Sequence, residues 1–133
     1  MTQSNIDVMG IIVDKMAEGE KFSKALASIY ANRNIRIPYK EEYCTEPIEH
    51  IGMPRRAANA LLRAKLRTLG DVIEFCEGKK ITDITGVGTG LGIDMFESIL
   101  DYCWSHMSQD EQTNFLIDTV ERNGDYIREN LEL

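Results

Sequence analysis

The residues best suited to bind an anion lie in the segment ITDITGVGTGLG, residues 81–92. Two isoleucines at helical spacing precede a Gly86-Val87-Gly88 turn, and an amphipathic pattern follows it. Glycines permit backbone angles that a side chain penalises, and Val87 between them can anchor the turn in the core. The N–H groups that begin the next helix lack partners within it and carry the positive end of its dipole. The pattern predicts a helix-hairpin-helix whose backbone holds a nucleic-acid phosphate.

Other phosphate-binding loops fit this turn less well. The dinucleotide motif GxGxxG fails at its last position, which is Leu91, and no strand pattern leads into the turn. A P-loop fails because no Gly-Lys-Ser/Thr follows. A plain glycine-rich turn between packed helices remains as the alternative. The backbone contacts that we expect with phosphate are at Gly86, Gly88, Thr89 and Gly90.

A basic helix is the second candidate element. Between residues 53 and 69 the chain carries five cations and no acid. At helical steps of three and four, Arg56, Asn59 and Arg63 share one face. Arginine and asparagine side by side can reach phosphates or base edges, and arginine is favoured by the negative potential of a narrow minor groove. The side chains that we expect to contact DNA are Arg55, Arg56, Asn59 and Arg63.

The distribution of charge matters more here than its sum. A net charge of -7 argues against a nucleic-acid partner, because affinity for phosphate depends largely on Lys and Arg. From Asp94 to the end, however, there are ten acids and only two cations. The chain therefore has a basic and an acidic pole, which would orient it on DNA. A solvated basic face that pairs with the acidic C-terminal third is the alternative.

The segment from Pro47 to Trp104 resembles the C-terminal domain of the bacterial RNA polymerase alpha subunit. The shared features are the opening Pro-Ile-Glu, the sequence RAANAL from Arg56, the Leu-Gly-Asp-Val that starts at Leu69, and the Gly88 turn that leads into the last helix. The resemblance implies a domain that binds the minor groove of A·T-rich promoter DNA and docks transcription activators.

By this resemblance, Arg56 is the arginine inserted into the groove, Asn59 is its polar neighbour, and Gly88 is the hairpin position whose backbone approaches phosphate. Where the family has Lys-Lys or Lys-Ser after the glycine, this chain has Thr-Gly-Leu-Gly at 89–92, with one extra residue. A cation is lost there, so DNA binding should be weaker or depend more on the other arginines of the basic segment. Residues 1–46 and 105–133 have no counterpart in the resemblance.

Helical periodicity predicts two helices in residues 1–46, which form an arm and linker. The first is interrupted at Gly19 and has a seam formed by Ile6, Met9, Val13 and Met16. This seam is short for a coiled coil, so packing on the core is favoured over a dimer through this helix. The second helix is capped by Ser23 and has an apolar side formed by Phe22, Leu26, Ile29 and Tyr30. An extended piece at 35–37 then ends at Pro38, and residues 39–46 are interpreted as a solvated linker.

Start and stop signals mark the remaining helices. A helix begins at Pro54 and ends near Arg63 or Ala64, and a capping box at Thr68 opens a short helix that Gly78 closes. One helical turn at 81–84 precedes the glycine turn, and a longer helix follows with Ile93, Phe96, Leu100, Cys103 and Trp104 on one face. A capping box at Ser108 starts the last helix, which ends at Asn123-Gly124.

These elements predict an all-α fold: a compact helix-hairpin-helix, SAM-like domain at 47–104, an N-terminal helical arm at 1–46 and a C-terminal helical extension at 105–133. Three widely spaced cysteines without a CxxC pair, and two distant histidines, suggest neither a disulfide framework nor a metal site. We expect no cofactor, and no enzymatic relay is evident. The chain lacks a membrane-spanning run and a secretory signal, so we expect a soluble, cytoplasmic protein.

The sequence therefore predicts a non-enzymatic protein that grips duplex DNA, with transcription regulation as its setting. A transcription factor or an RNA polymerase component is a further expected partner. The alternative is a protein-protein interaction module that has the same scaffold but does not bind DNA.

Overall fold

The computed structural model describes residues 2–29 and 35–124. Every named element in this part of the chain is helical, and its only β pairing is an isolated bridge between Pro47 and Thr68. The elements are α1 (Gln3–Ala17), α2 (Phe22–Ile29), α3 (Glu41–Cys44), the 3-10 turn η1 (Ile48–His50), α4 (Arg55–Arg63), α5 (Leu69–Gly78), the 3-10 turn η2 (Ile81–Asp83), α6 (Thr89–Ser105) and α7 (Gln109–Arg122). The predicted all-α class is confirmed.

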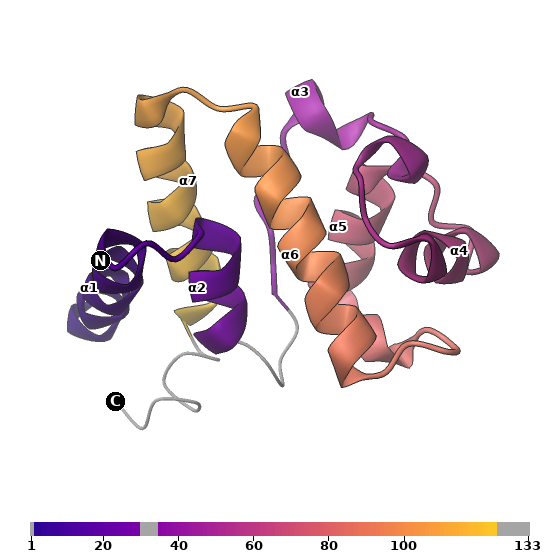
Figure 1. Cartoon of the computed structure of the whole chain (residues 1–133), viewed down its shortest axis with the longest axis horizontal. Coiled ribbons are helices and arrows are strands. Elements are labelled where there is room, and N and C mark those ends of the chain that lie inside the picture. Colours follow the sequence, from indigo (N-terminus) through magenta and orange to yellow (C-terminus); the bar gives the residue numbers. More distant parts are fainter. Residues whose placement is uncertain (1, 30–34, 125–133) are drawn as a thin grey trace.

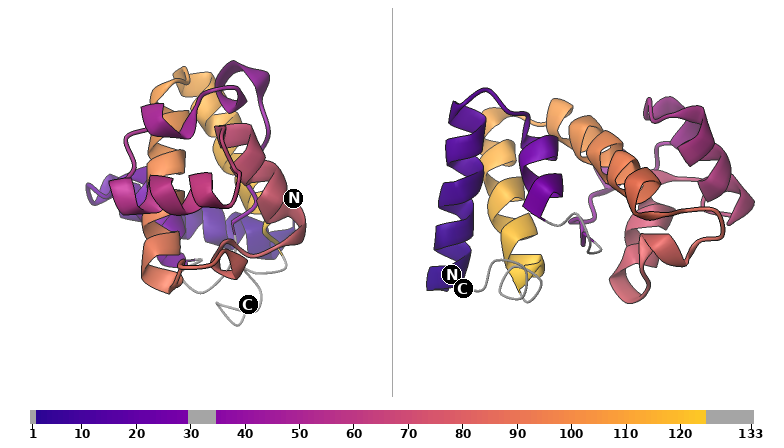
Figure 2. Two further views of the ribbon diagram at one scale, coloured as in Figure 1. Left: turned by 90° about the vertical axis from the view of Figure 1, so that its right-hand side faces the viewer. Right: turned by 60° about the horizontal axis from the view of Figure 1, so that its bottom comes forward.

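Helix α6 runs through the middle of the molecule and joins its two ends (Figure 1). At one end α1, α2 and α7 lie side by side, and α2 packs on α6 (Figure 2). At the other end α4 and η2 pack against α6, while α3 packs against α5. The basic helix and the glycine turn are therefore both at the end opposite α1 and α7 (Figure 1).

One hydrophobic cluster connects both ends of the molecule. The Phe22 ring of α2 stacks on Trp104 of α6 with centroids 4.2 Å apart, and it meets Phe115 of α7 edge-on at 5.9 Å. Aromatic contacts of this kind stabilise a core beyond the area that they bury. Side chains from before residue 47 and after residue 104 thus share a core with the segment between them.

The predicted face of the first helix is only partly right. Met9 and Met16 are partly buried against the core as predicted, but Ile6 and Val13 are not. Val8 and Ile12 are completely buried, whereas Ile6 and Val13 are each 49% exposed. Both pairs have helical spacing, but the side of α1 that contacts α2 and α7 is the one that carries Val8 and Ile12. The interruption at Gly19 is confirmed by its φ of 102°, a conformation that favours glycine.

Two further N-terminal predictions also fail. Ser23 is buried inside α2 and does not cap it. Residues 39–46 are not a solvated linker, because they contain α3, whose Tyr43 and Cys44 are buried. The Tyr43 hydroxyl donates to the Pro38 carbonyl at 2.7 Å, which satisfies this phenol within the core. The predicted position of Tyr30, and residues 125–133 of the C-terminal extension, lie outside the described residues.

The local start and stop signals are confirmed. Thr68 and Ser108 form capping boxes at the beginnings of α5 and α7. Helix α4 ends at Arg63 and α5 ends at Gly78, as predicted. The turn at 81–84 forms as η2. The particular helix-hairpin-helix arrangement stays a prediction.

Candidate nucleic-acid interface

Helix α4 presents its basic face to solvent. Its buried residues are Ala57, Ala60 and Leu61. The side chains predicted to contact DNA are all exposed: Arg55, Arg56, Asn59 and Arg63. Ala58 and Leu62 of the same helix are only half-buried.

The acidic helix α7 does not neutralise this face. Helices α4 and α7 lie at opposite ends of the molecule (Figure 1). The charged groups that Arg122 of α7 contacts are Asp118 at 3.2 Å and Glu77 at 3.7 Å. Among the described residues no ion pair joins a carboxylate to Arg55, Arg56 or Arg63. Helix α1 of the arm does not cover the basic face either, because it lies at the far end of the molecule (Figure 1).

The glycine turn is an exposed elbow with one anchored residue, and we refer to Gly86-Val87-Gly88 as the elbow. Val87 is buried and donates its backbone N–H to the Ile84 carbonyl at 3.0 Å. Gly86 has a φ of 87°, which strongly favours glycine. Gly88 instead has φ -91° and ψ -177°, which any residue can adopt. The expectation that both glycines are needed for their backbone angles is therefore wrong for Gly88.

Helix α6 starts with open amide groups directly after the elbow. Gly88 is its N-cap and offers no side chain to accept a hydrogen bond. The first bond of the helix runs from the Gly92 N–H to the Gly88 carbonyl at 2.9 Å, so the N–H groups of residues 89–91 precede the helical ladder. Thr89 and Gly90 are exposed there. A Cβ on Gly92 would lie 3.0 Å from Ile81 Cγ2, which shows how closely η2 packs on α6.

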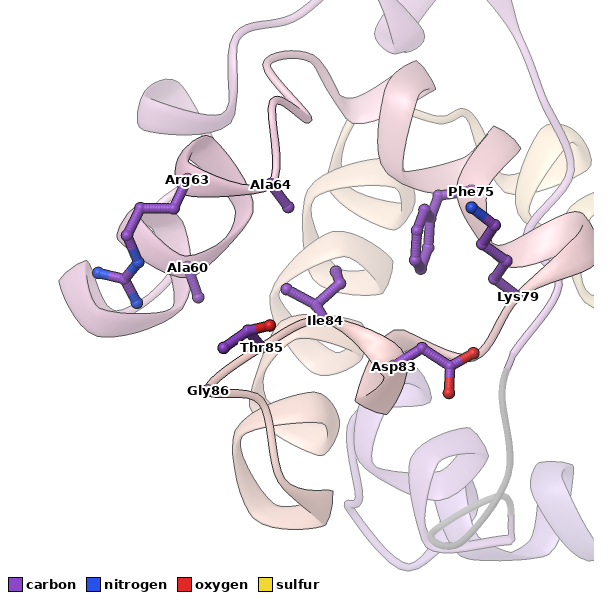
Figure 3. A pocket seen from close by; sticks show the side chains of 9 residues that line it. All are labelled: Ala60, Arg63, Ala64, Phe75, Lys79, Asp83, Ile84, Thr85 and Gly86. Carbon is purple, nitrogen blue, oxygen red and sulfur yellow. The ribbon is translucent and has the colours of Figure 1, made fainter.

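The basic helix and the elbow meet at Arg63. Its Nη2 atom lies 3.8 Å from the position that a Cβ on Gly86 would occupy. Figure 3 shows Arg63 at the rim of a groove between α4 and the segment containing Thr85 and Gly86. The structure thus brings together the end of the basic helix and the start of the predicted phosphate-binding turn.

Two carboxylates, Asp83 and Asp94, flank the elbow in the sequence, and they differ in their hydrogen bonding. Asp83 Oδ2 accepts the backbone N–H of Lys80 at 3.0 Å and so caps η2. Asp94 is exposed on α6, one turn after Gly90. Its charge opposes a phosphate at the start of the helix.

Sequence reasoning missed Lys79. This residue lines the same groove as Arg63, and its Nζ lies 5.5 Å from the centroid of the Phe75 ring. The Gly-Lys-Lys run at 78–80 was a signal that could have indicated a second cation near the elbow.

A hydrogen-bonded cluster of titratable side chains lies outside the interface. His50 Nδ1 is 3.0 Å from Glu46 Oε1, and the Tyr102 ring packs on the His106 ring at 4.2 Å. Burial raises the pKa of Tyr102, and the nearby Glu46 carboxylate raises it further. No three His, Cys, Asp or Glu side chains in residues 2–29 and 35–124 are placed to hold a metal ion.

Comparison of the chain with protein-family models, curated proteins and solved structures found no match. The similarity to the polymerase subunit therefore stays a prediction from the residues quoted above. Across the described ranges, no helix combines the length and the apolar character needed to cross a membrane.

Proposed function

We propose that the protein grips duplex DNA with the exposed face of α4 and the elbow before α6. The observation that carries this proposal is the approach of Arg63 to Gly86, because it joins a cationic surface to open backbone amides. Phosphate contacts in protein-DNA complexes commonly combine arginine side chains with the N-termini of helices.

The beginning of α4 departs from the usual placement of charge. Helices favour acidic residues in the first turn, but α4 has none and carries Arg55 and Arg56 there. Pro54 supplies no side-chain cap. The positive end of the helix dipole and two guanidinium groups therefore add at one place, which is unfavourable for the isolated chain and favourable beside a polyanion.

Lys65, in the same segment, has a backbone conformation that is unusual for a lysine. Its φ of 66° puts a lysine in the left-handed conformation directly after α4, where glycine is the usual residue. Such strain costs on the order of 1 kcal/mol and tends to occur at functional sites. The exposed Lys65 adds one more cation to the basic segment.

We assign each group the DNA contact that suits its chemistry. Arg56 enters the minor groove of A·T-rich DNA beside Asn59, because a narrow groove concentrates negative potential. Arg63 and the amides of residues 89–91 hold phosphates. A transcription factor or an RNA polymerase component as further partner, and a setting in transcription, follow from the resemblance alone.

A protein-interaction module is the second candidate function. The elbow lacks the lysines expected from the resemblance, and the exposed Asp94 opposes phosphate at the same place. These features favour a protein that has the same scaffold but does not bind DNA.

A binding titration separates the two candidates. A·T-rich and G·C-rich duplexes are titrated with the full chain at about 50 mM and about 200 mM salt, the range over which phosphate contacts weaken strongly. Arg56→Ala should weaken binding to the A·T-rich duplex markedly, whereas Lys24→Ala on α2, which also removes one exposed cation, should not. Equal effects of the two changes would show that the proposed site is wrong. No binding to either duplex at low salt would favour the interaction module.

A further inference from the structure

A groove lies between three elements that are distant in the sequence. It is bounded by the end of α4, the end of α5 and the segment from η2 to the elbow, and its volume is about 680 Å³. Figure 3 shows Ala60 and Ala64 on one side, Phe75 on the other, and Ile84 between them. This volume falls within the roughly 300–1,000 Å³ that is typical of small-molecule sites.

The walls of the groove are apolar and its two rims are cationic. The Phe75 ring and Ile84 provide apolar surface, while Arg63 and Lys79 stand at opposite sides (Figure 3). Asp83 is the one carboxylate among the lining residues, and the Lys80 N–H already bonds to it at 3.0 Å. Together these groups fit a ligand with an apolar body and a negative charge.

Arg63 is not required to close its own helix. The carbonyls of Ala60, Leu61 and Leu62 at the end of α4 accept backbone N–H groups from Ala64, Leu66 and Lys65 at 3.0–3.2 Å. The exposed Arg63 guanidinium has no carboxylate partner among the described residues. A guanidinium can bind a carboxylate or sulfonate through two parallel hydrogen bonds.

We propose that this groove binds a small amphipathic anion, with its aromatic or alkyl body between Phe75 and Ile84 and its acidic group on Arg63. The site goes beyond the proposed DNA contact, since it uses the apolar surface beneath Arg63. Because Arg63 belongs to both sites, the bound anion and a DNA phosphate exclude each other. That consequence rests on the proposed function, whereas binding to the groove does not.

The test uses anilinonaphthalenesulfonate as the probe, because it joins an aromatic body to one sulfonate and fluoresces in apolar surroundings. The full chain is titrated without DNA. We expect saturable binding that weakens about tenfold or more in Arg63→Gln, the change expected for loss of a charge-assisted hydrogen bond. Ala64→Phe should weaken binding similarly by filling the groove.

Matched controls separate the groove from general effects. Arg67→Gln removes an exposed arginine that does not line the groove, and Asn114→Phe adds the same ring on α7. Both should bind the probe within about twofold of the wild type, and circular dichroism should show that all four variants keep the helical fold. Equal affinity in all variants, or no saturable binding by the wild type, would overturn the site. Neutral phenylnaphthylamine should bind more weakly than the sulfonate, and equally tight binding would overturn the preference for an anion.

Discussion

The side-chain amide of Asn123 forms hydrogen bonds with both the backbone N–H and the backbone carbonyl of Arg36. Its Oδ1 accepts the Arg36 N–H at 2.8 Å, and its Nδ2 donates to the Arg36 carbonyl at 2.9 Å. The same amide also donates to the Thr119 carbonyl at 2.7 Å. An extended segment is thereby fixed to the end of α7, and the backbone polar groups of Arg36 find partners without a neighbouring strand, between the buried residues Ile35 and Ile37.

Asn123→Ala should destabilise the fold by about 2–4 kcal/mol, because three hydrogen bonds of roughly 0.5–1.5 kcal/mol each are lost and two backbone groups of Arg36 lose these partners. Urea unfolding measures the change. Asn114→Ala, at an exposed position of α7, is the control and should stay within about 0.5 kcal/mol of the wild type. Similar stability of both variants would contradict the role of Asn123.

The two elbow glycines should respond differently to the same substitution. Gly86→Ser should cost about 1–2 kcal/mol, because φ 87° is unfavourable for a residue with a Cβ. Gly88→Ser should be neutral or stabilise by a few tenths of a kcal/mol, since serine is a better N-cap and Gly88 already has a suitable backbone conformation. Thermal unfolding of the pair measures both effects. If Gly88→Ser proves as harmful as Gly86→Ser, the described elbow geometry is incorrect.

Glu111 makes the stability of α7 depend on pH. The Ser108 backbone N–H donates to Glu111 Oε1 at 3.1 Å, and this hydrogen bond lowers the pKa of the carboxyl. Because the folded pKa is lowered, the stabilisation is complete above the unfolded value of about 4.3 and disappears as pH falls through the folded value. Glu111→Gln should therefore lower Tm near neutral pH, and the difference from the wild type should close in acid. A gap in Tm that is constant with pH would argue against this effect.

The three cysteines should be protected thiols. Cys44, Cys76 and Cys103 are all buried. Burial raises the pKa of Cys44 and of Cys103, so both stay protonated near neutral pH and are poor nucleophiles. Dipyridyl disulfide should react slowly with the native chain and rapidly with three thiols after denaturation. Immediate reaction of a native thiol would contradict the described packing.

Local signals made part of this fold predictable. The capping boxes at Thr68 and Ser108 involve side chains and amides three residues apart, so the sequence alone contains the whole interaction. Helix α3 was missed because it has only four residues, and its burial depends on the remote Gly70. A Cβ at that glycine would lie 2.9 Å from the Cys44 carbonyl oxygen. No short sequence window contains that contact.

The candidate site was likewise predictable from the sequence only in part. The exposure of Arg56, Asn59 and Arg63 followed from helical periodicity, because a helix fixes which side chains share a face. The approach of Arg63 to Gly86, and the groove beneath them, depend on how α4 packs beside the elbow. Tertiary packing also selected Val8 and Ile12 over the equally periodic Ile6 and Val13.

A pair of matched glycine variants tests the DNA interface most directly. Gly90 and Gly10 are both exposed helical glycines, and an added Cβ at either would meet nothing within 4 Å beyond the local helix backbone. They lie on α6 beside the elbow and on α1 at the opposite end. Gly90→Asp and Gly10→Asp change the net charge equally. An aspartate in the first turn of α6 suits the helix dipole, so Gly90→Asp should fold normally.

The decisive measurement is the affinity of these two variants for an A·T-rich duplex, determined by fluorescence anisotropy at low salt. We predict that Gly90→Asp binds at least about tenfold more weakly than the wild type, because a carboxylate then occupies the place of the phosphate. Gly10→Asp should stay within about threefold, as expected for a distant charge that salt screens. Equal affinities of the two variants would contradict the proposal that DNA binds at the start of α6.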